Sequence, residues 1–208
     1  HGDVIPFDCD LYAGQMGPRG NNVASYLANH ADLIIAIGTR LGFNSTFYSY
    51  DNISKSAKIV QVDIDPIALG RYFPIELGIN NDAKKFLENL SSLISLKKLN
   101  HNNSVWVNNF FNEKNKYYKN RDNEADTNSK IIQPSGLFKE LREILPKNSS
   151  VTLDAGTLCL QATDQFYFSK PKSLFTPLDF GLVGFSFAAG LGVKLAQPNT
   201  PVFSLMGD

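Results

Sequence analysis

Two short runs of apolar, β-branched residues point to the fold of this chain. The first, Leu33–Ile37, reads LIIAI and is closed by Gly38, and the second lies within KIVQVDID at 58–65. A run that is apolar at every position predicts a strand buried on both faces, as in a parallel sheet. A helical pattern stands before the first run, and another begins at Asp82, which we expect to cap it. Strands and helices in this order predict a parallel α/β layer.

A polar segment separates this layer from a second one. Residues 97–130 are rich in Asn and in charged residues, and we expect a helix near 105–118 followed by a linker. The expected division is therefore a first α/β unit at 1–96, the segment 97–130, and a second unit at 131–208.

The second unit repeats the strand and helix pattern. Pro134 fits the first turn of a helix that ends near 144, before Pro146. Strands are expected at 150–153 and 201–206, with a helix over 157–166 and a Gly-rich loop that runs into a helix of small residues. The expected fold class is α/β, built from two parallel-sheet units.

Composition excludes several classes of function. The 208 residues carry 20 Lys and Arg against 20 Asp and Glu, so no basic face for nucleic acid or a membrane surface is expected. The apolar runs are too short to span a bilayer. Cys9 and Cys159 lack metal spacing and predict reduced thiols in a cytoplasmic protein. Both ends read as cut, which suggests a piece of a longer protein.

Three motifs stand out in the stretch 154–208: a strand that ends in Asp154-Ala155-Gly156, the segment DFGLVGFSFAAGLGVKLAQP, and PVFSLMGD at the carboxyl end. Together they resemble the cofactor half of thiamine-diphosphate enzymes of the acetolactate synthase type. The amino-terminal part, with ADLIIAIGTRL and KIVQVDIDP, is similar to the middle domain of the same family. The motifs follow one another in the family's order.

The resemblance implies a site for thiamine diphosphate and Mg²⁺. Asp208, after Gly207, stands where the family's metal-binding Asp lies, and a hard cation prefers such oxygen ligands. The alternative for Asp208 is an ordinary Asp in a turn at the end of a strand. Gly156 and Thr157 stand where the family contacts the diphosphate. The alternative role of Thr157 is to cap the helix, and Leu158, where many relatives have His, cannot donate a hydrogen bond.

A Gly-rich loop is implied to hold the aminopyrimidine ring of the cofactor. By analogy the carbonyl of Gly181 and the N–H of Val183 bind the ring, and the Val183 side chain wedges beneath the cofactor. Leu182 and Gly184 complete this loop. The alternative is a turn that lets a helix pack closely on the sheet.

The first unit offers a weaker candidate. Gly38-Thr39-Arg40 and Asp63-Ile64-Asp65 follow two strands, where several relatives bind FAD or ADP. No GxGxxG motif is present, and we favour a domain that holds no nucleotide. FAD is therefore a possible cofactor of this unit, but not the favoured one.

The function implied is that of a transferase which joins pyruvate to a second 2-oxo acid. Sulfoacetaldehyde acetyltransferase is the alternative within the family, and a non-catalytic nucleotide-binding or structural module is the alternative outside it. The family's catalytic Glu belongs to a domain absent from this chain, so no catalytic residue is expected here. The resemblance also implies a homo-oligomer, either a dimer or a tetramer.

Overall fold

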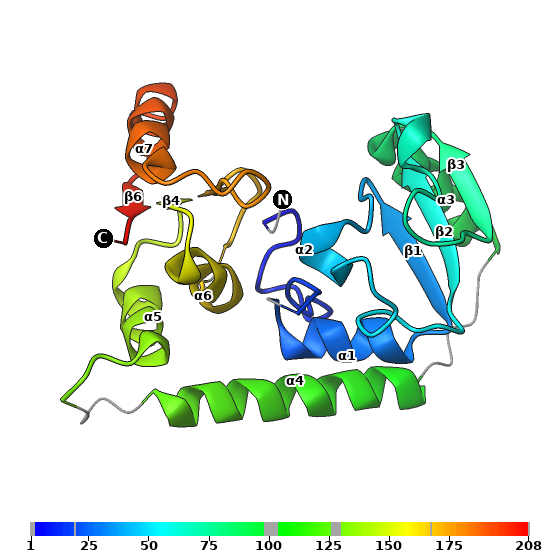
Figure 1. Ribbon diagram of the computed structural model, residues 1–208, viewed down its shortest axis with the longest axis horizontal. Helices are drawn as coiled ribbons and strands as arrows, with labels where there is room; N and C mark the ends of the chain where they lie inside the picture. The colour runs from blue at the N-terminus through cyan, green and yellow to red at the C-terminus, as the bar shows by residue number, and fades with distance from the viewer. Residues whose placement is uncertain (1–2, 19, 98–103, 126–129, 167, 208) are drawn as a thin grey trace. The chain divides into compact units, whose positions relative to one another are not determined.

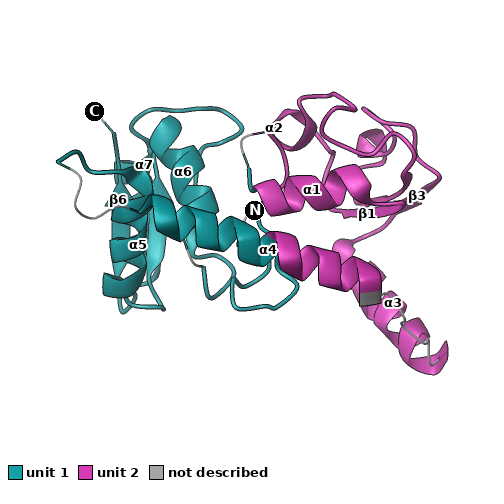
Figure 2. Cartoon of the chain, turned by 90° about the horizontal axis from the view of Figure 1, so that it is seen from below, with its two compact units in different colours: residues 1–15, 19–21, 114–208 teal, residues 16–18, 22–113 magenta. Residues whose placement is uncertain are grey.

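The computed structural model describes residues 3–18, 20–97, 104–125, 130–166 and 168–207. These residues form two compact units. Unit 1 contains residues 1–15, 19–21 and 114–208, and unit 2 contains residues 16–18 and 22–113, coloured teal and magenta in Figure 2. The 21-residue helix α4, Ser104–Glu124, contains the point where the division falls.

Unit 2 is built on three parallel strands in the order β1-β2-β3 (Figure 1). Residue Ile35 of β1 pairs with Val60 of β2, and Val60 pairs in turn with Leu77 of β3. The strands and helices of this unit are β1 (Leu33–Ile37), β2 (Lys58–Asp63), β3 (Leu77–Asn80), α1 (Asn22–His30), α2 (Phe43–Thr46), the 3-10 helix η1 (Pro66–Ala68) and α3 (Ala83–Lys97).

The core of unit 2 covers only one face of β1. Ala36 packs there with Leu41, Ile53 and Ile59. Leu33 and Ile35 point to the other face and are 51 % and 47 % exposed. The expectation that β1 is buried on both faces is therefore wrong for the described chain, because side chains alternate along a strand and one set lies outside the core.

Helix α3 begins as its sequence predicts. The side chain of Asp82 accepts a hydrogen bond from the Lys85 N–H at 3.1 Å, which confirms the expected cap. No residue of α3 is buried, however, so its apolar side remains accessible in the described chain.

Unit 1 holds a second parallel sheet, with the strand order β5-β4-β6. Leu153 of β4 pairs with Leu205 of β6, and Val151 pairs with Leu174 of β5. The remaining strands and helices of the unit are α5 (Pro134–Ile144), β4 (Ser150–Leu153), α6 (Thr157–Gln165), β5 (Leu174–Phe175), α7 (Phe185–Ala196) and β6 (Val202–Leu205).

The two faces of β4 pack against different helices. Val151 and Leu153 join Phe138 of α5 and Cys159 of α6 in one hydrophobic core. Thr152 points the other way, and its hydroxyl donates to the backbone oxygen of Ser186 in α7 at 2.9 Å. Helices α5 and α6 therefore cover one face of the sheet and α7 covers the other, which confirms the parallel α/β fold.

The amino-terminal residues of the described chain pack in unit 1. The Asp3 carboxylate accepts hydrogen bonds from the N–H groups of Ser173 and Leu174, at 2.8 and 3.1 Å. The Phe7 N–H donates to the Phe168 oxygen at 3.0 Å. The two compact units therefore differ from the expected division into 1–96, 97–130 and 131–208. That division stays a prediction about the domains of the protein.

None of the helices in the described ranges combines the length and the apolar character that a membrane crossing requires.

Candidate functional site at the carboxyl edge of the unit 1 sheet

The carboxyl ends of β4 and β6 meet at one edge of the sheet. The Asp154 N–H donates to the Leu205 oxygen at 3.0 Å, so the turn after β4 begins beside the end of β6. From β4 the chain continues to β5 on one side and then crosses to β6 on the other side. Such a change of direction opens a crevice at the carboxyl edge, where α/β proteins bind ligands.

The first side of this crevice is the start of helix α6. Gly156 occupies the N-cap position with φ +123°, a backbone conformation that side chains disfavour. Thr157 is the first helical residue rather than the cap, so the capping alternative for Thr157 is wrong. Both residues are exposed. The first N–H groups of a helix lack partners within it and bind anions readily, as a diphosphate requires.

The loop 181–184 forms the second side. Gly181 and Gly184 both have positive φ, +68° and +85°, and Gly184 is the N-cap of α7. The Gly181 N–H donates to the Pro177 oxygen at 2.7 Å, which turns the chain into the loop. Leu182 is exposed, and the Val183 side chain is 82 % exposed. An exposed apolar residue between two such glycines is available to contact a ligand.

Asp154 joins the two sides. Its Oδ2 accepts from the Gly184 N–H at 2.8 Å, and its Oδ1 accepts from the Ser186 N–H at 3.2 Å. Asp154 is only 6 % exposed. The hydrogen bond from Gly184, followed by that from Ser186, holds the pKa of the Asp154 carboxyl below its usual value, although burial opposes this shift.

In the sequence, Asp154 is recognisable as part of the Asp154-Ala155-Gly156 motif but not as a site residue. One signal in the sequence points to such a role for another residue. Helix α7 starts at a glycine, which offers no side chain to cap the helix. The first N–H groups of this helix are therefore open to an acceptor from elsewhere in the chain.

A buried hydroxyl cluster fixes α7 on the sheet. The Thr152 hydroxyl lies 3.0 Å from the Ser186 hydroxyl and 2.8 Å from the Ser204 hydroxyl. The Ser186 hydroxyl donates back to the Thr152 oxygen at 2.8 Å. Gly190 lies directly over this cluster, and a Cβ there would collide with the Ser204 hydroxyl. Close packing of α7 on the sheet thus depends on Gly190, whereas a Cβ at Gly181 or Gly184 of the loop would meet no atom within 4 Å.

The metal ligand expected from sequence lies outside the described residues, since Asp208 is one of the positions left out. Gly207 follows β6 at the same edge as Asp154 and is exposed. Among the residues that the structure does describe, no three His, Cys, Asp or Glu side chains are grouped to hold a metal ion.

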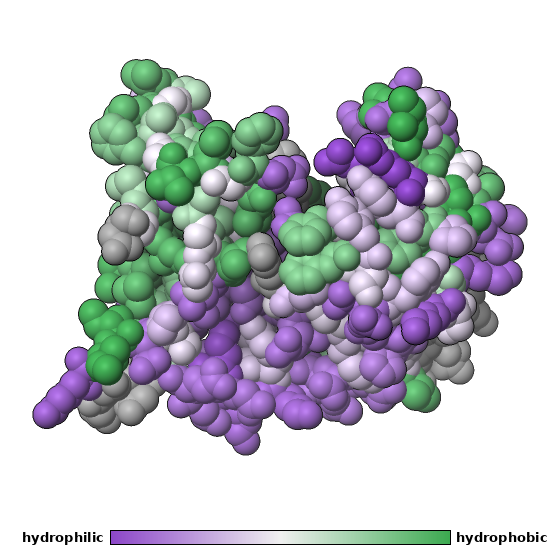
Figure 3. All heavy atoms as spheres, viewed as in Figure 1, coloured by the Kyte–Doolittle hydropathy of each residue, from purple (hydrophilic) through white to green (hydrophobic). Residues whose placement is uncertain are grey.

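The donors at this edge fit a diphosphate cofactor. The start of α6 offers backbone N–H groups, Gly156 adds no side chain, and Val183 offers apolar surface across the edge. The exposed apolar surface extends from the loop along α7, where Phe187, Leu191 and Leu195 recur at intervals of four (Figure 3).

The strand ends in unit 2 are occupied by their own loops. The side chain of Gln61 donates to the Thr39 oxygen at 2.9 Å and accepts from the Gly70 N–H at 2.8 Å. The Asp63 carboxylate accepts from the Asp65 N–H at 2.9 Å, and Asp65 caps η1. The prediction that this domain holds no nucleotide stays a prediction.

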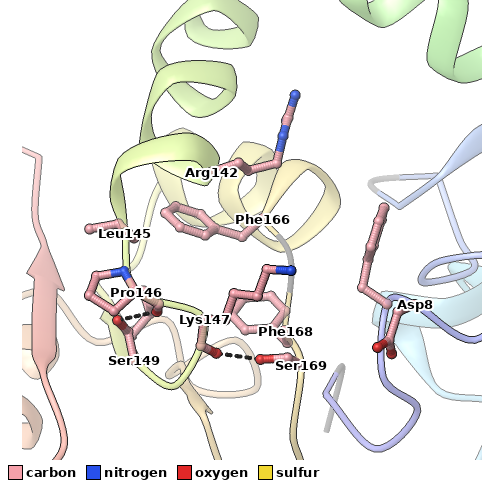
Figure 4. A pocket seen from close by; sticks show the side chains of 11 residues that line it. Asp8, Arg142, Leu145, Pro146, Lys147, Ser149, Phe166, Phe168 and Ser169 are labelled. Atoms are coloured by element: carbon pink, nitrogen blue, oxygen red, sulfur yellow. Dashed lines mark hydrogen bonds between the residues drawn. The ribbon is translucent and has the colours of Figure 1, made fainter.

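A separate cavity of about 160 Å³ lies in unit 1, at the opposite edge of the sheet. The segment before β4, with Leu145, Pro146 and Lys147, forms one wall, and Phe166 and Phe168 lie across from it (Figure 4). Because it adjoins the beginning of β4, this cavity is not part of the crevice at the carboxyl edge.

Comparison with protein families matches both parts of the chain. The family model "Thiamine pyrophosphate enzyme, central domain" matches residues 1–90. The model "Thiamine pyrophosphate enzyme, C-terminal TPP binding domain" matches residues 154–208, which contain every candidate residue of the crevice.

Curated relatives extend over nearly the whole chain. The sulfoacetaldehyde acetyltransferase of Alcaligenes xylosoxydans xylosoxydans is 28% identical over 229 residues, which cover 99% of this chain and 38% of the relative. A probable acetolactate synthase large subunit of Methanocaldococcus jannaschii is 30% identical over 211 residues, covering 98% of this chain and 34% of the relative. The acetolactate synthase large subunit of Haemophilus influenzae is 28% identical over 200 residues, covering 95% and 34%.

The chain thus spans little more than a third of the length of these relatives. Its order of motifs and its matches to two successive domains agree with one another, and they confirm the expectation from sequence: this chain belongs to the thiamine pyrophosphate enzymes.

Proposed function

We propose that the protein carrying this chain is a carboligase of the acetolactate synthase type, dependent on thiamine diphosphate and Mg²⁺. Its substrates are pyruvate and a second 2-oxo acid. The observation that supports this most directly is the pairing of an exposed helix start at Gly156 with the 181–184 loop at one edge of the sheet. The two are held together by Asp154.

Each part of the crevice has a role in this proposal. Gly156 and Thr157 bind the diphosphate through the N–H groups at the start of α6. Gly181 and Val183 bind the aminopyrimidine ring through their backbone, and the Val183 side chain supports a bent cofactor. Asp208, after Gly207, ligates the metal ion. Leu182 and Gly184 complete the loop.

When bound, thiamine diphosphate supplies the carbanion stabilisation that decarboxylation of a 2-oxo acid needs. The residues of this chain position the cofactor and exclude alternative orientations. The proton-transfer residue that acts on the cofactor, a Glu by resemblance to the family, lies outside this chain, so the chain alone is proposed to be inactive.

A second candidate is a sulfoacetaldehyde acetyltransferase. Relatives with that name are 28% identical and cover essentially the whole chain, which is as close as the acetolactate synthases. Both candidates use the same cofactor site, so the crevice described above supports them equally.

We also propose a cytoplasmic homo-oligomer, a dimer or a tetramer. Cys9 and Cys159 are both free thiols, as a reducing compartment favours. The exposed apolar stripe Phe187, Leu191 and Leu195 on α7 supports an interface between subunits.

The deciding experiment uses the full-length protein. Acetolactate formation from pyruvate is measured with and without thiamine diphosphate and Mg²⁺, in parallel with acetyl phosphate formation from sulfoacetaldehyde and phosphate. Product in the first assay that depends on both additions supports the carboligase. Product only in the second assay supports the acetyltransferase. Failure to bind thiamine diphosphate would leave a structural module and reject both.

A further inference from the structure

Asp154 lies between the two segments that the proposed function assigns to the cofactor. Its backbone opens the turn that leads through Gly156 into α6. Its carboxylate accepts hydrogen bonds from the N–H groups of Gly184 and Ser186 at the start of α7. One buried residue thus connects the diphosphate side of the crevice to the pyrimidine side.

The carboxylate also caps a helix that has no cap of its own. Gly184, the N-cap residue of α7, offers no side chain for the free N–H groups of the first turn. Asp154 supplies acceptors for two N–H groups at this helix start, from 30 and 32 positions earlier in the chain. Its negative charge lies at the positive end of the helix dipole, which strengthens the attraction.

The loop itself has a backbone that depends on outside support. Gly181 and Gly184 adopt left-handed conformations, and glycine gives an unbound loop many alternatives. Val183 is exposed, so its side chain adds little packing that would hold the loop. The bond from Gly181 to Pro177 secures one end, and Asp154 secures the other.

We infer that Asp154 is a positioning residue, whose carboxylate holds the 181–184 loop in its ligand-receiving shape before the cofactor binds. The inference rests on the proposed function, because it takes thiamine diphosphate as the ligand at this edge. A loop that is ordered in advance loses less conformational entropy on binding, so its affinity is higher. Loss of the carboxylate should therefore weaken binding without removing a direct contact.

The test compares the full-length protein with its Asp154→Asn variant. An amide of the same shape keeps one acceptor oxygen but turns an NH₂ group toward an N–H donor. The dissociation constant for thiamine diphosphate is measured by calorimetry at saturating Mg²⁺. The variant should bind roughly tenfold more weakly, or weaker still, since bonds to charged groups are among the stronger ones.

Hydrogen exchange provides a readout that does not involve the cofactor. In the wild-type protein without cofactor, the amides of Gly184 and Ser186 should be protected, and in the variant they should exchange faster. Amides within α5 (Pro134–Ile144) should exchange alike in both proteins. Rapid exchange of Gly184 and Ser186 in the wild type would overturn the inference even if the variant fails to fold.

Asp164→Asn is the matched control. Asp164 is also a carboxylate of unit 1 that accepts two hydrogen bonds, from the Asn21 amide at 2.8 Å and from the Tyr117 hydroxyl. The Asp164→Asn variant should be less stable than the wild type but should bind the cofactor with unchanged affinity. Equal affinities in wild type and Asp154→Asn, or equal losses in both variants, would reject positioning. Absence of binding to the wild type would instead reject the proposed function.

Discussion

The Oδ2 atom of Asp154 and the backbone nitrogen of Gly184 lie 2.8 Å apart, although 30 positions separate the two residues. This bond brings the end of β4 and the start of α7 together at one edge of the sheet. The acceptor is a buried carboxylate at a helix start. Because a carboxylate can be protonated, the contribution of this bond to the stability of the fold should depend on pH.

Acid should remove the stabilisation that Asp154 provides. The folded-state pKa of its carboxyl is lowered from 3.8, mainly by the hydrogen bond from Gly184. A lowered pKa means that the stabilisation is complete above the unfolded value and is lost as pH falls through the folded value. The difference in melting temperature between wild type and Asp154→Asn should therefore be constant near neutrality and shrink below about pH 4. A difference that grows in acid would contradict this assignment.

Gly190→Ala should destabilise unit 1. A Cβ at this position collides with the Ser204 hydroxyl and lies 3.3 Å from the Thr152 hydroxyl. We expect a loss of about 1–3 kcal/mol in the free energy of unfolding, measured by denaturant titration. Gly192→Ala is the control in the same helix, because its Cβ meets no atom within 4 Å. That change should stabilise the helix by up to about 1 kcal/mol, and equal effects at both sites would refute the packing argument.

Val183→Ala should separate cofactor binding from stability. Val183 is 82 % exposed, so its truncation should change the free energy of unfolding by less than about 0.5 kcal/mol. Affinity for thiamine diphosphate in the full-length protein should fall, because the proposed wedge is shortened. Ile132→Ala, at another exposed position, should alter neither quantity. Unchanged affinity in Val183→Ala would remove this residue from the proposed site.

Phe138→Ala should be among the most destabilising single changes in unit 1. Phe138 is fully buried and packs edge-on against the ring of Phe166, with 5.5 Å between the ring centroids. Truncation of a buried Phe costs about 3–5 kcal/mol. Phe180→Ala removes the same atoms from a largely exposed side chain and should cost less than about 0.5 kcal/mol. Unfolding transitions of the two variants measure the difference.

The two thiols should differ in reactivity. Cys9 is exposed, whereas Cys159 is buried beside the Thr176 hydroxyl and burial raises its thiol pKa. Because the thiolate is the reactive form, iodoacetamide should modify Cys9 in the native protein and reach Cys159 only after unfolding. Peptide mass spectrometry checks this, and early modification of Cys159 would show that the core opens readily.

Several elements were predictable from the sequence because their signals are local to the segment. The strands Leu33–Ile37 and Ser150–Leu153 and the helix Pro134–Ile144 have the predicted bounds. Gly38 directly follows the first strand, and Pro134 and Pro146 stand at the two ends of the helix, and such residues act within a few positions of themselves. The strand Leu174–Phe175 was not predicted, since two residues are too few to show a period.

The amino-acid sequence by itself determined the α/β class, most of the strands and helices, and the motifs that place the chain among thiamine pyrophosphate enzymes. Periodicity and glycine positions are local properties, so they are readable without coordinates. The tertiary structure decided which face of Leu33–Ile37 is covered and that Asp154 caps α7. Both depend on what lies opposite a side chain in space, and no local pattern records a hydrogen bond across 30 residues.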